Sequence, residues 1–266
     1  MSIIEKIIEE KKKEILELKN LHGETLFSSP KKEKDFFLNS LKNNKYLSVI
    51  AEIKPKSPSH GEMIKKEETP EVINLYKKLG VNAISVLTDK NFFGGGYDLL
   101  KNVSTMVDIP LLAKDFIIDT IQIDMAILSG ASAILLISDI LDDKTLLKLY
   151  EYAKLKKINV LLEAHEIENI KRCINLSAEI IGINNRNLKT LKENLNHSIQ
   201  VRDLLPEDIV KLSLSSIKSR EDAKRVANVG YDGILIGSVI MKAFNKSAAL
   251  NSFLKIEKEI AKVLEI

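Results

Sequence analysis

The hydrophobic positions from Ser48 onward alternate between two patterns. Short, almost continuously apolar runs of strand character are separated by longer segments in which apolar residues recur every three or four positions. The runs predict strands over residues 48–53, 83–87, 110–113, 133–137, 159–163, 180–183, 209–214 and 233–236. The longer segments predict helices over residues 70–79, 98–107, 119–129, 142–156, 166–176, 195–204, 219–229 and 248–263.

Three glycines occur where a predicted helix ends and the next strand begins. Gly80, Gly130 and Gly230 open the segments GVNAISVL, GASAILLI and GYDGILIG. A left-handed C-cap favours glycine, so each is expected to end its helix. Pro70 suits the first turn of another helix, with Thr69 before it as the expected N-cap. The chain therefore repeats a helix–glycine–strand unit.

The repeated unit predicts the fold class. Strands without polar alternation are typical of a parallel sheet buried on both faces. Eight such units in 266 residues favour an α/β fold of the (β/α)8 or TIM-barrel type over an open doubly wound sheet. The glycine-rich run after residue 92 lacks the GxGxxG spacing of a dinucleotide-binding fingerprint. We expect residues 46–266 to form one barrel domain.

The first 45 residues carry a different pattern. Apolar residues at helical spacing, with Glu and Lys between them, are Ile3, Ile4, Ile7, Ile8, Ile15 and Leu18. They predict an amphipathic helix, and a second short helical pattern runs through Phe36, Phe37 and Leu41. We expect residues 1–45 to be an N-terminal helical extension packed on the barrel, the alternative being a helix that binds a partner.

Composition narrows the range of partners. The chain is 45% hydrophobic and 29% charged, which excludes disorder throughout. Its 40 Lys and Arg against 37 Asp and Glu do not indicate nucleic-acid binding. No apolar run approaches the roughly 18–20 residues that span a bilayer. One cysteine, Cys173, and four scattered histidines fit a reducing cytoplasm and no metal site. We expect a cytoplasmic monomer or weak homo-oligomer without a nucleic-acid or membrane partner.

Charged residues gather where predicted strands end. In a barrel of this type the catalytic groups lie at the carboxyl ends of the strands. Glu52 and Lys54 are two residues apart, so both face the same side, where they fit a structural ion pair as well as a site. Lys114 and Glu163 at two further strand ends favour a site. Such a set supplies general acids and bases without a metal or cofactor.

The last two strand ends resemble a phosphate site. Gly237 and Ser238 open a short helix, where free backbone N–H groups favour an anion. Ser57 and Lys54 are expected to complete that site. We therefore expect a phosphorylated small molecule as the substrate.

The sixth predicted strand ends in a further polar pair. Asn184 and Arg186 are also two residues apart and offer an amide and a planar cation to a carboxylate or hydroxyl, although a surface salt bridge would equally occupy Arg186. His165 is expected to be a polar loop or helix-start residue. Three other histidines are expected to face solvent: His22, His60 and His197.

Five segments of the chain resemble the indole-3-glycerol-phosphate synthase family of tryptophan biosynthesis. They are SVIAEIKPKSPSHG, ISVLTDKNFFGGGYDLL, PLLAKDFIIDTIQIDMA, VLLEAH and IIGINNRNLKTL. The resemblance covers nearly the whole chain, including the N-terminal helix. It implies ring closure of 1-(2-carboxyphenylamino)-1-deoxyribulose 5-phosphate, with loss of CO2 and water, to indole-3-glycerol phosphate.

The resemblance also implies a role for each site residue. Lys114 would be the general acid on the substrate carbonyl, and Glu163 would stabilise positive charge or transfer a proton. Lys54 and Glu52 would be the acid–base pair for dehydration, and Asn184 would orient hydroxyl groups; the division of labour between the two lysines stays open. The residues implied in substrate binding are Phe93, Arg186, Leu188, Ser215 and Leu235. The residues implied in phosphate binding are Ser57, Lys54, Ser216, Gly237 and Ser238.

The chain departs from the family at the seventh strand. The family has Glu-Ser-Gly-Ile where this chain has Leu214-Ser215-Ser216-Ile217. Leu214 removes an active-site carboxylate, and the Ser216 side chain is strained if its φ is positive. Two alternatives therefore stay open beside the synthase: a catalytically weakened barrel that only binds a phosphate ligand, and a Schiff-base aldolase using a strand-end lysine.

Overall fold

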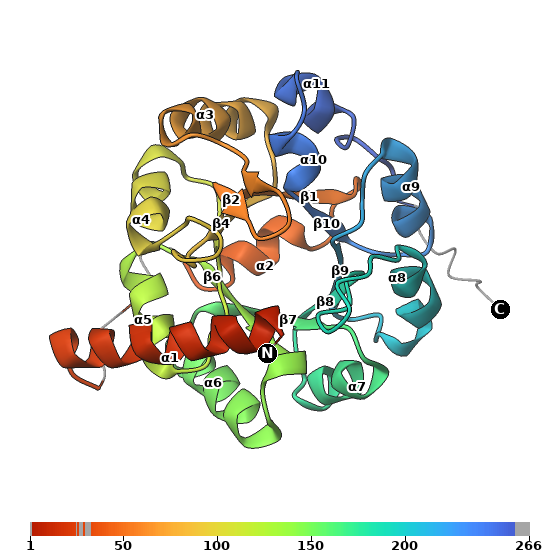
Figure 1. The fold of residues 1–266 in the computed structure, drawn as a ribbon. Helices are drawn as coiled ribbons and strands as arrows, with labels where there is room; N and C mark the ends of the chain where they lie inside the picture. Colours follow the sequence, from red (N-terminus) through yellow and green to blue (C-terminus); the bar gives the residue numbers. More distant parts are fainter. Residues whose placement is uncertain (1, 25, 27–28, 30–32, 259–266) are drawn as a thin grey trace.

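Eight parallel strands close into a barrel in the computed structural model, which describes residues 2–24, 26, 29 and 33–258 (Figure 1). Around the barrel the strands follow the order β1-β10-β9-β8-β7-β6-β5-β4, and β4 pairs with β1 to close it. The barrel strands are β1 Ser48–Ile53, β4 Ala83–Leu87, β5 Leu111–Lys114, β6 Ala133–Ile137, β7 Asn159–Ala164, β8 Ile180–Asn184, β9 Val210–Leu214 and β10 Gly233–Ile236. The predicted (β/α)8 barrel is confirmed.

Helices surround the barrel and connect successive strands, as Figure 1 shows. The α-helices are α3 Thr69–Leu79, α4 Tyr97–Met106, α5 Thr120–Leu128, α6 Asp143–Leu155, α7 Ile167–Asn175, α8 Asn196–Val201, α9 Arg220–Asn228, α10 Ser238–Met241 and α11 Lys246–Asn251. Short 3-10 turns occupy η1 Lys66–Glu68, η2 Ser138–Ile140 and η3 Arg202–Leu204. A small antiparallel hairpin after β1 consists of β2 Lys56–Ser57 and β3 Gly61–Glu62.

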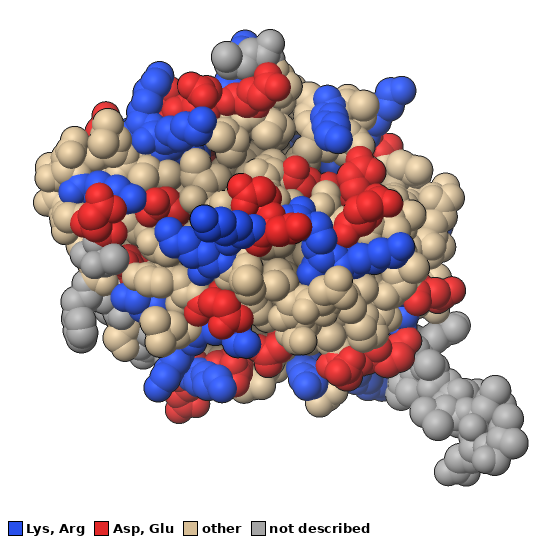
Figure 2. All heavy atoms as spheres, turned by 90° about the horizontal axis from the view of Figure 1, so that it is seen from below, with Lys and Arg blue, Asp and Glu red and all other residues tan. Residues whose placement is uncertain are grey.

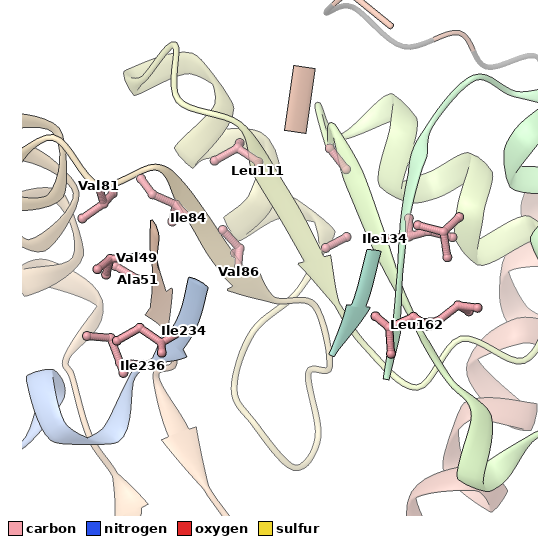
Figure 3. Close-up of a cluster of buried hydrophobic side chains, with 14 of the residues drawn as sticks. Val49, Ala51, Val81, Ile84, Val86, Leu111, Ile134, Leu162, Ile234 and Ile236 are labelled. Carbon is pink, nitrogen blue, oxygen red and sulfur yellow. The ribbon is translucent and has the colours of Figure 1, made fainter. Parts of the chain in front are cut away.

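Side chains alternate between the barrel interior and the layer under the helices. Along β1, Val49, Ala51 and Ile53 belong to the apolar cluster between strands and helices, part of which is drawn in Figure 3. Ile50 belongs instead to the cluster inside the barrel. This two-residue period applies to every strand, so position along a strand decides which residues enter the interior.

The two N-terminal helices pack at opposite ends of the barrel. α2 (Phe36–Leu41) covers the end where strands begin, and its Leu38 N–H donates to the Asn159 side chain at the start of β7. α1 (Ile3–His22) crosses in front of the barrel in Figure 1, with Ile7 and Ile15 buried beneath it. The expected N-terminal helix is confirmed, whereas the division of the chain into an extension over residues 1–45 and a barrel over 46–266 stays a prediction.

The glycine and helix-start predictions have different outcomes. Gly80, Gly130 and Gly230 follow their helices with φ of 70°, 92° and 90°, as a left-handed helix end requires. Thr69 is the first residue of α3 and not its N-cap. Glu68 holds the cap position, because the preceding 3-10 turn already gives it helical dihedral angles of φ −83° and ψ −16°.

The predicted helix over residues 248–263 is wrong across residues 252–258. α11 ends at Asn251, and the chain continues in turns to a bridge between Tyr46 and Glu257. Phe253 and Ile256 in this irregular stretch are buried in the core, so tertiary packing explains their apolar character. Residues 259–263 of that prediction lie outside the described residues.

Positively and negatively charged side chains are mixed on the surface. On the face in Figure 2, Lys and Arg are interspersed with Asp and Glu, and neither sign forms an extended region. Among the helices of the described residues, none is long and apolar enough to cross a membrane.

Candidate active site

The final inward-facing residue of every barrel strand lies at the carboxyl end, around one cavity of about 690 Å³. Each follows an interior residue two positions earlier, so the alternation of side chains along a strand places it there. In barrel order these residues are Glu52, Leu87, Lys114, Ile137, Glu163, Asn184, Leu214 and Leu235. Half of the cavity floor is therefore polar and half is apolar.

The polar half contains two lysine–carboxylate pairs. Lys54 Nζ lies 2.6 Å from Glu52 Oε1, and Lys114 Nζ lies 3.9 Å from Glu163 Oε2. Asn184 Nδ2 donates to Glu163 Oε1 at 2.8 Å. Both carboxylates are buried, with 3% of their surface exposed. The five residues predicted to be catalytic are thus brought together, although their roles stay predictions.

The two carboxylates differ in proton affinity. Burial raises the pKa of the Glu163 carboxyl above its ordinary value, although Lys114 and the hydrogen bond from Asn184 act in the opposite direction. Burial alone would raise the pKa of Glu52 too, but the ammonium groups of Lys54 and Lys114 outweigh it and hold that pKa below its ordinary value. The two carboxyls therefore sit in different electrostatic environments, which suits different roles in one reaction.

Arg186 lines the cavity from the loop after β8. Its backbone N–H donates to Asn184 Oδ1 at 2.9 Å, which couples the loop to the polar half of the floor. Its guanidinium forms an ion pair with Glu193, which also pairs with Lys218 at 2.9 Å. The salt bridge foreseen as the alternative for Arg186 therefore exists, and the remaining guanidinium N–H groups leave capacity for a substrate carboxylate.

The apolar walls come from more of the chain than the sequence indicated. Phe93, Leu188 and Leu235 line the cavity as predicted. Further apolar residues that sequence reasoning missed line it too: Ile3, Ile4, Ile7, Phe116 and Leu135. The first three form one face of α1, which the amphipathic pattern had revealed without showing that it covers the mouth of the barrel.

The predicted phosphate residues also border the cavity. Ser57 is buried in the β2–β3 hairpin, and Gly237 and Ser238 form the start of α10. Ser215 and Ser216, after β9, have φ of 64° and 63°, so both adopt the left-handed region that glycine occupies more easily. Backbone N–H groups at this corner offer donors to an anion.

The histidines differ from their predicted placement in one case. His197 does not face solvent: it is half-buried, its ring centroid is 4.3 Å from that of His165, and its Nε2 is 2.7 Å from the His165 carbonyl oxygen. Packing of α8 against the loop after β7 produces this contact between residues distant in sequence. His22 and His60 are exposed as expected. Among the described residues, no three His, Cys, Asp or Glu side chains are grouped to hold a metal ion.

The fold and site together define a (β/α)8-barrel enzyme site with acid–base side chains at its floor and anion donors at its rim. The family model for indole-3-glycerol phosphate synthase matches residues 4–253. The chain belongs to the indole-3-glycerol phosphate synthase family, and its activity is the decarboxylating ring closure that forms indole-3-glycerol phosphate in tryptophan biosynthesis.

Curated relatives agree with this assignment, and a solved structure is similar in fold. An indole-3-glycerol phosphate synthase of Staphylococcus aureus (strain MRSA252) is 37% identical over 262 residues, covering 97% of this chain and 99% of the relative. The one of strain bovine RF122 / ET3-1 is 38% identical over 234 residues, 88% and 89% of the two chains. The crystal structure of 3-hexulose-6-phosphate synthase from Salmonella typhimurium has a TM-score of 0.62 at 15% identity, covering 78% of this chain and 96% of that one. This last likeness concerns the fold alone.

Proposed function

We propose that the cavity closes the indole ring by general acid–base catalysis on 1-(2-carboxyphenylamino)-1-deoxyribulose 5-phosphate. One observation carries the proposal: two ammonium groups, each beside a buried carboxylate, share the floor of one cavity. The same cavity has apolar walls from Phe93, Leu188 and Leu235 that suit an aromatic ring beside these proton donors and acceptors.

Lys114 is the proton donor of the first step in this proposal. The ring carbon that bears the carboxylate attacks the ketone carbon. Lys114 protonates the ketone oxygen, which becomes a hydroxyl. Glu163 stabilises the positive charge that develops on the ring and nitrogen. The ring carboxylate then leaves as CO2, and its bonding electrons return to the ring. Burial of Glu163 supports this role, because an electrostatic contact is stronger where water is excluded.

Lys54 and Glu52 act in the second step. The hydroxyl formed at the ketone carbon leaves as water with a proton from one member of the pair. The other member accepts a proton from the adjacent carbon, and the indole double bond forms. Their 2.6 Å separation supports proton transfer within the pair. Asn184, held by Glu163, orients the substrate hydroxyls.

The remaining residues hold the two ends of the substrate. Arg186 binds the ring carboxylate before it leaves. The ring itself packs on Phe93, Leu188 and Leu235, with Ser215 at the edge. The phosphate is bound by Ser57, Lys54 and backbone groups of Ser216, Gly237 and Ser238. Binding of its carboxylate and its phosphate thereby fixes the carbon chain of the substrate, and the reacting atoms lie over the polar half of the floor.

Leu214 provides the decisive experiment. It is the inward-facing residue between Asn184 and Leu235 on the floor, so the lost carboxylate would point at the substrate. We expect measurable turnover by the natural chain and up to about 10²-fold higher kcat in Leu214→Glu, since one hydrogen-bonding group contributes on that scale. Leu214→Gln is the matched control and should gain much less. Absence of turnover in the natural chain and in Leu214→Glu would contradict the proposal.

The two alternatives foreseen from the sequence are not favoured by the family assignment. A Schiff-base aldolase predicts a covalent adduct on Lys54 or Lys114 after borohydride treatment with substrate. Both ammonium groups are paired with carboxylates, which supports proton transfer instead. A barrel that only binds predicts a phosphate ligand at the site without formation of indole-3-glycerol phosphate.

We further propose a cytoplasmic monomer or weak homo-oligomer, with residues 1–45 as an extension on a 46–266 barrel. The single cysteine, Cys173, is buried and free, which fits a reducing compartment. Sedimentation equilibrium of the purified chain would measure its assembly, and a tight oligomer would contradict this part of the proposal.

A further inference from the structure

Lys11 on α1 is a buried cation that the mechanism does not use. Only 1% of its side chain is exposed. Its Nζ lies 2.6 Å from Glu14 Oε2, 2.9 Å from Asp115 Oδ1 and 3.0 Å from Asp89 Oδ2. We refer to these four residues as the Lys11 cluster. A buried ammonium is tolerated only when it is paired, and here three carboxylates from three elements surround it.

Asp89 connects the cluster to one aromatic wall of the cavity. It follows β4, and its Oδ1 accepts the backbone N–H groups of Phe92 at 2.7 Å and Phe93 at 2.9 Å. Phe93 lines the cavity, with its ring centroid 6.1 Å from that of Phe116. The position of Asp89 therefore determines where the Phe93 ring lies.

Asp115 connects the cluster to the end of β5. It directly follows Lys114, its Oδ1 accepts the Phe116 N–H at 2.8 Å, and its Oδ2 accepts the Thr88 hydroxyl at 2.9 Å. Lys114 and Phe116 both line the cavity. One ammonium group thus contacts the carboxylates that follow two neighbouring strands.

The helix that carries Lys11 also supplies a wall of the cavity. Ile7 lies one turn before Lys11 on the same face, and Ile3 and Ile4 lie one turn further toward the N-terminus. All three line the cavity, which we call the α1 wall. In Figure 1 the N-terminal end of α1 lies in front of the barrel near β7, and the rest of the helix extends outward past α5. Its first turns therefore lie over the site, and Lys11 is a buried anchor close to them.

We propose that Lys11 is a positioning residue of the site, which holds the α1 wall in register with the loops that carry Phe93 and Phe116. This inference rests on the proposed function, because those three surfaces enclose the substrate ring. Removing the ammonium leaves Asp89 and Asp115 close together and buried without a counter-ion, so the two loops and α1 separate. The effect reaches substrate binding through the walls, not through contact with the substrate.

Steady-state kinetics of Lys11→Met test the proposal, with Lys12→Met as the matched control. Lys12 is the next residue, and 63% of its side chain is exposed. Its Nζ lies 3.2 Å from Glu9 Oε1, and neither residue lines the cavity. We expect KM to rise about tenfold or more in Lys11→Met, with a smaller fall in kcat, because the loss is one of substrate binding. Lys11→Arg, which keeps the charge, should recover most of the loss, and Lys12→Met should match the natural chain.

A double-mutant cycle with Ile7→Ala keeps the test decisive if Lys11→Met folds poorly. Ile7→Ala leaves the Lys11 cluster intact and should itself raise KM. In the combined variant with Lys11→Gln, which removes the charge but keeps an N–H donor for the carboxylates, the losses should be less than multiplicative, since both act through the α1 wall. Unchanged KM in a folded Lys11→Met variant, or losses that multiply fully, would overturn the inference.

Amide hydrogen exchange separates this inference from the proposed function. Exchange in residues 3–10 should accelerate in Lys11→Met and stay unchanged in Lys12→Met, whether or not the natural chain turns over the substrate. If the natural chain has no turnover but exchange changes in this way, only the proposed function fails. If turnover is normal and exchange in α1 is unaffected, only the role of Lys11 fails.

Discussion

Gly237 is a position where one methyl group should disable catalysis without removing any chemical group. Its φ of −142° lies outside the left-handed region, so the prediction concerns the space around its Cβ position. A Cβ there would lie 2.5 Å from Glu52 Oε1 and 2.8 Å from Glu52 Cβ, whereas ordinary contact begins near 3.4 Å. Gly237→Ala therefore requires Glu52 or the adjoining strand ends to move by several tenths of an ångström or more.

The size of the effect follows from what Glu52 holds. Its carboxylate is buried and lies 2.6 Å from Lys54 Nζ, so displacement disturbs the acid–base pair of the dehydration step. A misplacement of about 1 Å costs roughly 10²-fold in rate. Overpacking costs about 1–3 kcal/mol, which at roughly 2–4 °C per kcal/mol for a chain of this size predicts a modest fall in Tm. The backbone N–H of residue 237, which we propose binds the phosphate, is retained, so KM should change much less than kcat.

Product fluorescence gives a direct assay, because the chain contains no tryptophan to mask the indole that forms. Gly237→Ala, Glu52→Gln and the double variant are measured together. If the added methyl acts through Glu52, the double variant loses little more than Glu52→Gln alone. A kcat of Gly237→Ala close to that of the natural chain, or a double variant whose losses multiply, would refute the steric reasoning.

Three further predictions concern the same cavity. Lys114→Met should lower kcat by about 10²–10⁴-fold in the fluorescence assay, because it removes the proposed proton donor of ring closure. Ser216→Gly should stabilise the fold by about 1 kcal/mol in calorimetry, since it relieves a left-handed residue, and Ser59→Gly should not. The two carboxyls should show opposite pH dependence in denaturant titrations, Glu163 as pH rises above the ordinary value of 4.5 and Glu52 as pH falls below it. The pKa of Glu163 is raised in the folded state, so its protonated form stabilises the native state. That contribution is lost as pH rises past 4.5. Over that rise Glu163→Gln therefore gains stability relative to the natural chain. The folded pKa of Glu52 is lowered, so Glu52→Gln is the less stable chain above pH 4.5, and the difference disappears on acidification.

Local patterns predicted the elements of the barrel well where they were buried on both faces. The runs at 48–53 and 83–87 became β1 and β4 with the same bounds, because strands of a closed parallel barrel are apolar along their whole length. The same criterion failed after Asn251. There Phe253 and Ile256 are apolar because they pack into the core from an irregular segment, and spacing alone does not separate that case from a helix.

The candidate site divides in a similar way. Glu52, Lys114 and Glu163 could be identified because each ends a strand, where this fold places its chemistry. Lys11 could not, since Asp89 and Asp115 come into contact with it only when α1 docks on the barrel. His197 was missed for the same reason, as its contact with His165 joins α8 to the loop after β7.

The sequence by itself therefore determined the repeating units, the side of each strand that its residues face, and which side chains can exchange protons. These properties follow from backbone geometry over a few residues. Only the tertiary structure decided which groups meet: Leu214 beside Leu235 on the floor, and the face of α1 over the mouth. Such contacts arise when the barrel closes and when α1 docks on loops that are distant from it in sequence. Local periodicity carries no information about them.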